Sequence, residues 1–112
     1  MPSNTTSNKF FYVYVLESLK DGDRYIGYTN NLKRRIKEHQ AGYNFSTKFR
    51  RPFKLIYFEG GLSDEDSKRR EHYLKTTQGR RFLGLRLIEY KRQSAFAIGS
   101  WYTGYVQRLS SN

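Results

Sequence analysis

Two short segments rich in aromatic and β-branched residues, 11–16 (FYVYVL) and 24–29 (RYIGYT), most constrain how this chain can fold. Each has the length and composition of a β-strand. An Asp-Gly pair at 21–22 lies between them and is typical of a tight turn. The sequence therefore predicts an antiparallel hairpin, and we expect Tyr25 to lie about opposite Tyr14 on it.

A helix is predicted directly after the hairpin, over 31–40. Asn30 can cap its N-terminus, and Gly42 suits its C-terminus. Leu32 and Ile36 are four residues apart and form an apolar stripe along this helix. Arg35 and His39 have the same spacing, so we expect them on the neighbouring part of the same face, close to the hairpin.

A third strand is predicted over 53–59, ended by a Gly-Gly pair. Ser63 is a suitable N-cap for a helix over 64–76, and a further helix is expected over 78–90. Three strands and flanking helices indicate an α/β (α+β) fold with a small three-stranded antiparallel sheet.

The chain has 112 residues, which suits one domain with a modest core. We expect a disordered lead-in over 1–8, a domain over 9–92 and an aromatic C-terminal tail of unknown order over 93–112. The chain has no cysteine, which excludes disulfides and thiolate zinc sites. It shows no signal-peptide or membrane-span pattern, so we expect a cytoplasmic location.

The charge balance points to a polyanionic partner. Lys and Arg number 21 against 10 Asp and Glu, for a net charge of +11. Such an excess favours nucleic acid, because contacts to phosphates release condensed counterions. A membrane surface is a weaker alternative, since no basic amphipathic helix with a large apolar face is evident.

Four short sequence motifs occur in a defined order, and their combination is far more specific than any one of them alone. They are Tyr12-Val13-Tyr14, then Tyr25-Ile26-Gly27, then Asn31, Leu32, Arg35 and His39, and finally Glu71 within a basic helical segment. Together they resemble the GIY-YIG nuclease family over about residues 10–90. The likeness is to its small single-domain members, which resemble the UvrC N-terminal nuclease domain and its stand-alone relatives.

The resemblance implies a metal-dependent endonuclease that hydrolyses DNA and leaves 5′-phosphate and 3′-hydroxyl ends. It assigns Tyr14 as general base or positioner of the attacking water, and Tyr25 as a hydrogen-bond partner of that water or the phosphate. It assigns Arg35 to stabilising transition-state charge, and His39 to orienting Tyr14 or transferring a proton. Glu71 is the expected ligand of a single Mg²⁺ or Mn²⁺ ion.

Six further cations are expected to contact nucleic acid: Lys33, Arg34, Lys48, Arg50, Arg51 and Lys75. One departure from the family concerns the asparagine that often follows the glutamate helix. It is absent here, and Gln78 is a candidate substitute. The loss bears on rate or phosphate placement more than on the fold.

No separate DNA-reading segment is evident, so we expect low sequence specificity or selection of a branched or single-stranded DNA structure. DNA repair, recombination and mobile-element processing are the expected settings. Two other functions stay open: a catalytically inactive basic module that binds nucleic acid, and a small RNA-associated protein. The sequence leaves the oligomeric state open.

Overall fold

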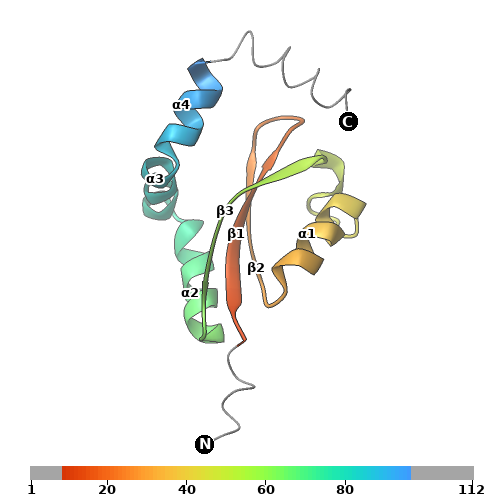
Figure 1. Cartoon of the computed structure of the whole chain (residues 1–112), viewed down its shortest axis with the longest axis vertical. Coiled ribbons are helices and arrows are strands. Elements are labelled where there is room, and N and C mark those ends of the chain that lie inside the picture. The colour runs from red at the N-terminus through yellow and green to blue at the C-terminus, as the bar shows by residue number, and fades with distance from the viewer. Residues whose placement is uncertain (1–8, 97–112) are drawn as a thin grey trace, which may run out of the picture. The chain divides into compact units, whose positions relative to one another are not determined.

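The computed structural model describes residues 9–96, with side chains to residue 93 (Figure 1). Internal contacts divide the chain into two units, the first ending at Thr76 and the second beginning at Thr77. Every residue expected at the catalytic or nucleic-acid site lies in the first unit. None of the helices within residues 9–96 is long and apolar enough to cross a membrane.

The first unit is built on a three-stranded antiparallel sheet, as the sequence predicts. Its strands are β1 (Phe11–Ser18), β2 (Arg24–Thr29) and β3 (Phe53–Gly61), in the order β2-β1-β3. Helix α1 (Leu32–Ala41) covers one face, and helix α2 (Asp64–Leu74) covers the other (Figure 1). The central strand β1 is therefore enclosed on both faces.

The hairpin register differs from the prediction by two residues. Gly27, not Tyr25, pairs with Tyr14. The turn between the strands closes between Ser18 and Asp23, so the first pair of the hairpin is Glu17 with Arg24. This first pair fixes the register of all the other pairs. The Tyr14 ring consequently lies over a residue that has no side chain.

Helix α1 begins one residue later than its expected cap implied. The Asn31 side chain accepts a hydrogen bond from the Arg34 backbone N–H at 3.1 Å, so Asn31 and not Asn30 is the N-cap. Gly42 ends the helix in the left-handed conformation, with φ of 84°, as expected. The predicted apolar stripe packs on a buried core cluster of Tyr14, Leu16 and Phe53.

Two other boundaries move relative to the sequence prediction. Strand β3 continues through Gly60 and Gly61, because both residues still pair with β1. Helix α2 begins after Ser63, as expected, and its last residue is Leu74. A 3-10 turn, η2 (Lys48–Arg50), lies between α1 and β3.

The second unit contains α3 (Thr77–Arg86) and α4 (Ile88–Phe96) where one helix over 78–90 was predicted. The helix is interrupted at Leu87, although its N–H still donates to the Leu83 carbonyl at 2.9 Å. The expected lead-in and residues 97–112 of the expected tail lie outside the described residues.

Gly27 permits the close approach of Tyr14. A Cβ at this position would lie 2.4 Å from both Cζ and Oη of the tyrosine. We expect Gly27→Ala to lower the free energy of unfolding by about 1–3 kcal/mol through overpacking. Gly61→Ala is the matched strand control, since nothing lies within 4 Å of its added methyl. Urea unfolding checks both variants, and equal stabilities would contradict this packing.

Candidate active site

A hydrogen bond between two buried side chains lies at the centre of the site. Tyr14 on β1 and His39 on α1 are both fully buried. The Tyr14 hydroxyl oxygen lies 2.8 Å from Nε2 of His39. The ring of Tyr14 reaches outward across Gly27, from the central strand toward the edge strand β2.

Thr47 holds the other side of the imidazole. Nδ1 of His39 lies 2.9 Å from Oγ1 of Thr47, which is itself fully buried. The Thr47 hydroxyl donates to the Asn44 carbonyl at 3.4 Å. Its proton is thereby used, so we infer that Thr47 accepts from Nδ1–H of His39. Nε2 is then free to accept the proton of Tyr14.

This environment keeps both titratable groups neutral near pH 7. Burial, together with the nearby positive charge of Arg35, lowers the pKa of His39 to about 4. Burial also raises the pKa of Tyr14 to about 12, against the opposing effect of a hydrogen bond to Arg35. A neutral imidazole therefore faces a protonated phenol.

Arg35 lies beside Tyr14 and remains partly accessible, with 29% of its side chain exposed. Its Nη1 donates to Glu38 at 2.9 Å. Burial by itself lowers the pKa of the guanidinium, but the hydrogen bonds to Glu38 and Tyr14 outweigh this and leave the pKa raised. Arg35 is a fixed cation with donors still available to an anion.

Tyr25 completes an aromatic group with the two buried side chains. Its ring centroid lies 6.3 Å from that of Tyr14 and 5.1 Å from that of His39. Tyr25 is only partly buried, so its ring lies between the core and the solvent. The hairpin and α1 thus bring together Tyr14, Tyr25, Arg35 and His39.

Glu71 comes from α2, on the opposite face of the sheet from α1. Its side chain is 17% exposed, and its carboxylate pairs with Nζ of Lys75 at 2.7 Å. Burial is the main cause of the raised pKa of Tyr14, and the charge of Glu71 adds only a small contribution from the other face of the sheet. Lys75, expected at the nucleic-acid surface, is thus a partner of the expected metal ligand.

The donor set suits only an ion that keeps much of its hydration. Within residues 9–96, no group of three or more His, Asp and Glu side chains is close enough to hold a metal. A single carboxylate fits Mg²⁺, which usually retains several waters and binds through one or two carboxylates and a phosphate. Glu71 satisfies that requirement once Lys75 releases it.

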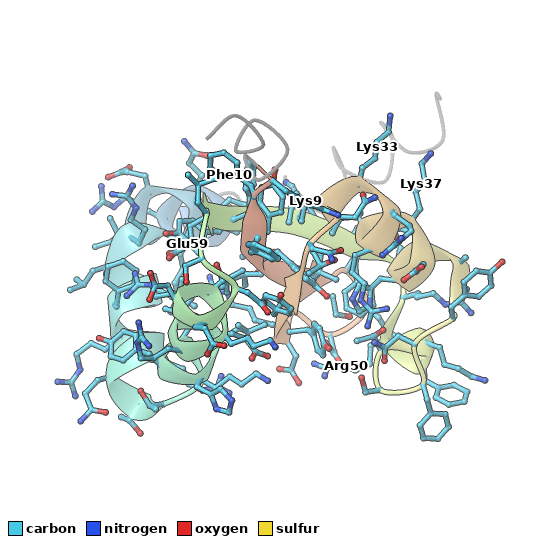
Figure 2. The ribbon with its side chains drawn as sticks, turned by 90° about the horizontal axis from the view of Figure 1, so that it is seen from below. Lys9, Phe10, Lys33, Lys37, Arg50 and Glu59 are labelled. Carbon is cyan, nitrogen blue, oxygen red and sulfur yellow. The ribbon has the colours of Figure 1, made fainter. Side chains whose placement is uncertain are left out.

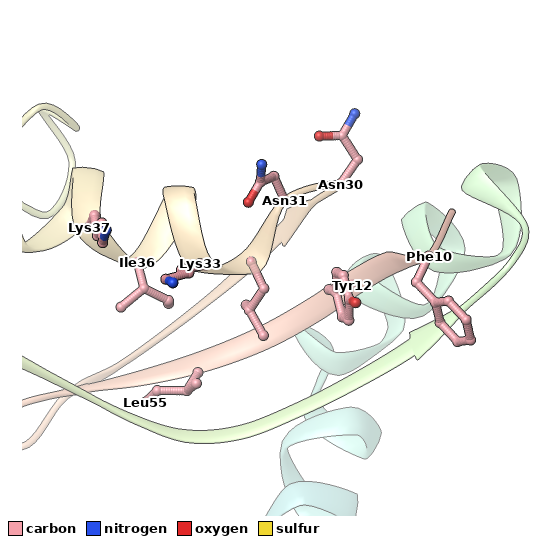
Figure 3. A pocket seen from close by; sticks show the side chains of 9 residues that line it. Phe10, Tyr12, Asn30, Asn31, Lys33, Ile36, Lys37 and Leu55 are labelled. Carbon is pink, nitrogen blue, oxygen red and sulfur yellow. The ribbon is translucent and has the colours of Figure 1, made fainter. Parts of the chain in front are cut away.

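Lys33 lies on a groove between α1 and the sheet. The groove has a volume of about 610 Å³ and includes Phe10, Tyr12 and Leu55 on its sheet side (Figure 3). Lys37, which the sequence analysis did not select, lines it as well, one helical turn from Lys33 (Figure 2). Neither lysine forms an ion pair with another residue of the described part of the chain.

Two of the other cations expected to contact nucleic acid, Arg50 and Arg51, are bound to groups of the protein itself. Arg50 pairs with the hairpin-turn acids Asp21 and Asp23, at 3.5 and 3.0 Å. Arg51 donates to two backbone carbonyls, those of Lys48 at 2.8 Å and of Gln40 at 3.3 Å. Both arginines thus hold the loop before β3 in place.

The remaining two are surface cations. Arg34 is exposed and lies 3.7 Å from Glu38. Lys48 lies over two exposed phenylalanine rings of the loop before β3. Thr47, whose role the sequence analysis missed, belongs to this loop, and no spacing rule connects it to His39.

The buried histidine should make stability depend on pH. Its folded pKa of about 4 lies below its usual 6.5, so its contribution is complete above 6.5 and is lost as pH falls toward 4. We expect a loss of about 2.5 kcal/mol between pH 7 and 4.5 from this group. Urea unfolding of His39→Gln should show a correspondingly smaller loss. Equal losses in the two proteins would show that His39 is not held neutral by folding.

Known proteins carry related sequences. The family model of the GIY-YIG catalytic domain matches residues 10–83. The UPF0213 protein YazA of Bacillus subtilis is 39% identical over 95 residues, covering 83% of this chain and 90% of that protein. The UPF0213 protein CPE1444 of Clostridium perfringens is 45% identical over 65 residues, covering 57% of this chain and 69% of that protein.

One solved structure is also similar: the solution NMR structure of the UPF0213 protein BH0048 from Bacillus halodurans. It is 38% identical, with coverage of 66% of this chain and 81% of that chain, and a TM-score of 0.43. The domain match spans most of the first unit, and the relationship to YazA extends over most of both chains. This chain therefore belongs to the GIY-YIG family of nucleases.

Proposed function

We propose that this protein is a metal-dependent endonuclease that hydrolyses phosphodiester bonds in DNA. The observation that supports this best is the joint position of Arg35, Tyr25 and the Tyr14–His39 pair. A phosphoryl transition state needs a fixed cation, a positioned water and a means of tolerating the leaving oxygen. These side chains match those needs.

Arg35 binds the scissile phosphate in this proposal. Its guanidinium can donate two parallel hydrogen bonds to phosphate oxygens, which an ammonium cannot do. Glu38 and Tyr14 hold the side chain, while its partial exposure leaves room for the substrate. The cation is thus oriented before the substrate arrives.

The two tyrosines take different parts because they differ in burial. Tyr25 is partly exposed and holds the attacking water or a phosphate oxygen. Tyr14 is fully buried with a pKa of about 12, so it stays protonated and serves better as a positioner than as a free base. It donates to neutral His39 and keeps Arg35 in place.

Glu71 is the proposed ligand of a single Mg²⁺ or Mn²⁺ ion, which when bound supplies Lewis acidity and eases departure of the leaving oxygen. Lys75 must release the carboxylate for this. With one protein ligand, the ion should bind weakly until nucleic acid adds a phosphate oxygen.

Lys33 and Lys37 support a path for the strand along the groove beside α1. Arg34, Lys48 and Lys75 are proposed as further phosphate contacts, whereas Arg50 and Arg51 reach phosphate only if they exchange their present partners. Backbone contacts of this kind give low sequence specificity. Such an enzyme would serve DNA repair, recombination or mobile-element processing in the cytoplasm.

A cleavage assay with matched variants tests this function. Plasmid, branched and single-stranded DNA are incubated with Mg²⁺, with Mn²⁺ or with EDTA. We expect Glu71→Gln and Arg35→Lys to reduce cleavage by about 100-fold or more, because each removes a group that acts mainly in the transition state. Binding in EDTA should change far less.

Glu65→Gln is the control, since it makes the same chemical change in the exposed first turn of the same helix. Its cleavage should match that of the unaltered protein. Metal-independent cleavage, or equal cleavage by Glu71→Gln, would contradict the proposed enzyme. Salt-sensitive binding without cleavage would favour an inactive binding module, and preference for RNA without a metal effect would favour an RNA-associated protein.

A further inference from the structure

Two bare phenylalanine rings project from the loop between α1 and β3. Phe45 is 78% exposed and Phe49 is 65% exposed. Their rings pack edge to face, with centroids 6.1 Å apart and planes at 85°. Nζ of Lys48 lies 5.9 Å from one centroid and 5.0 Å from the other. The three side chains form an exposed aromatic–cation cluster.

The loop that carries this cluster is anchored at several points. Thr47, midway between the two phenylalanines, is fully buried and bonded to His39. Arg50 holds the following residues through its ion pairs to Asp21 and Asp23. Its carbonyl also accepts a 2.7 Å hydrogen bond from Ser18. The rings are therefore presented by a fixed backbone.

The same anchor links the loop of the cluster to the candidate active site. Thr47 contacts His39, and His39 contacts Tyr14, so two hydrogen bonds join the loop to the buried phenol. Phe45 and Phe49 each lie two residues from this anchor. The loop of the cluster and the candidate active site are therefore joined by hydrogen bonds between buried side chains.

We propose that Phe45, Phe49 and Lys48 form a stacking site for an unpaired nucleobase of the bound strand. This rests on the proposed function and deepens it by naming the substrate feature that the enzyme selects. Exposed aromatic faces beside a cation are suited to stack a base and neutralise its phosphate. A base inside a duplex has both faces covered by its neighbours, so only an unpaired base fits.

Charge argues against a second copy of the chain as the occupant. Each copy carries a net charge of +11, and pairing two clusters would bring two Lys48 ammonium groups together. A phosphodiester strand supplies the opposite charge along with the aromatic base. The chemistry of the cluster therefore fits nucleic acid better than self-association.

Fluorescence anisotropy in EDTA tests the site without cleavage. The ligands are a labelled oligothymidylate, an abasic strand of the same length and a duplex. We expect the unaltered protein to bind oligothymidylate more tightly than the abasic strand. The double variant Phe45→Ala/Phe49→Ala should bind oligothymidylate about tenfold or more weakly, with little change for the other two ligands.

Leu62→Ala is the matched control, because Leu62 is also apolar and 55% exposed but lies between β3 and α2. Its affinities should be unchanged. Phe49→Trp should retain affinity, and its fluorescence should be quenched by oligothymidylate but not by the abasic strand. Oligouridylate tests whether the base can come from RNA. If the unaltered protein binds oligouridylate and oligothymidylate equally well, the stacking site takes RNA as well as DNA.

The site is overturned if the double variant, with unchanged urea unfolding, keeps its preference for oligothymidylate over the abasic strand. It is also overturned if the variant loses affinity equally for all three ligands, or if it only converts a dimer to a monomer in sedimentation. These readouts need no metal. Glu71-dependent cleavage with no stacking would refute the site alone, and stacking with no cleavage would refute the enzyme alone.

Discussion

The hydrogen bond between Tyr14 and His39 is the contact on which the rest of the first unit depends. It joins the central strand to α1, and through Thr47 it fixes the loop that leads into β3. Gly27 of the edge strand leaves the space in which the phenol lies. Both side chains are fully buried, so breaking the bond would leave unsatisfied polar groups in the core. The same buried hydrogen bond therefore stabilises the fold and positions the side chains of the candidate site.

The features that depend on local periodicity could be predicted from the sequence. Alternating strand residues and an Asp-Gly turn predicted the hairpin, and a four-residue spacing placed Arg35 and His39 beside the apolar stripe of α1. Ser63 and Gly42 marked helix ends correctly, because caps act through their own side chain or backbone conformation. The helices and strands that carry the site residues are thus encoded at short range.

The features that depend on distant contacts could not be predicted in the same way. The pairing of Tyr14 with Gly27 depends on where the turn closes, and Asn31 replaced Asn30 as cap by a difference of one residue. Thr47 and Arg50 take their roles from partners that only the folded chain brings near. These contacts also anchor the loop that exposes Phe45 and Phe49.

Binding of Mn²⁺, followed by the EPR signal of the free ion, shows whether Glu71 holds a metal ion together with the nucleic acid. The protein is titrated with and without a non-hydrolysable oligonucleotide, and the ion bound by the oligonucleotide alone is subtracted. We expect weak binding by the protein alone, tighter binding in the complex, and loss of that gain in Glu71→Gln. An equal gain in Glu71→Gln would contradict this expectation, because the ion would then be held elsewhere.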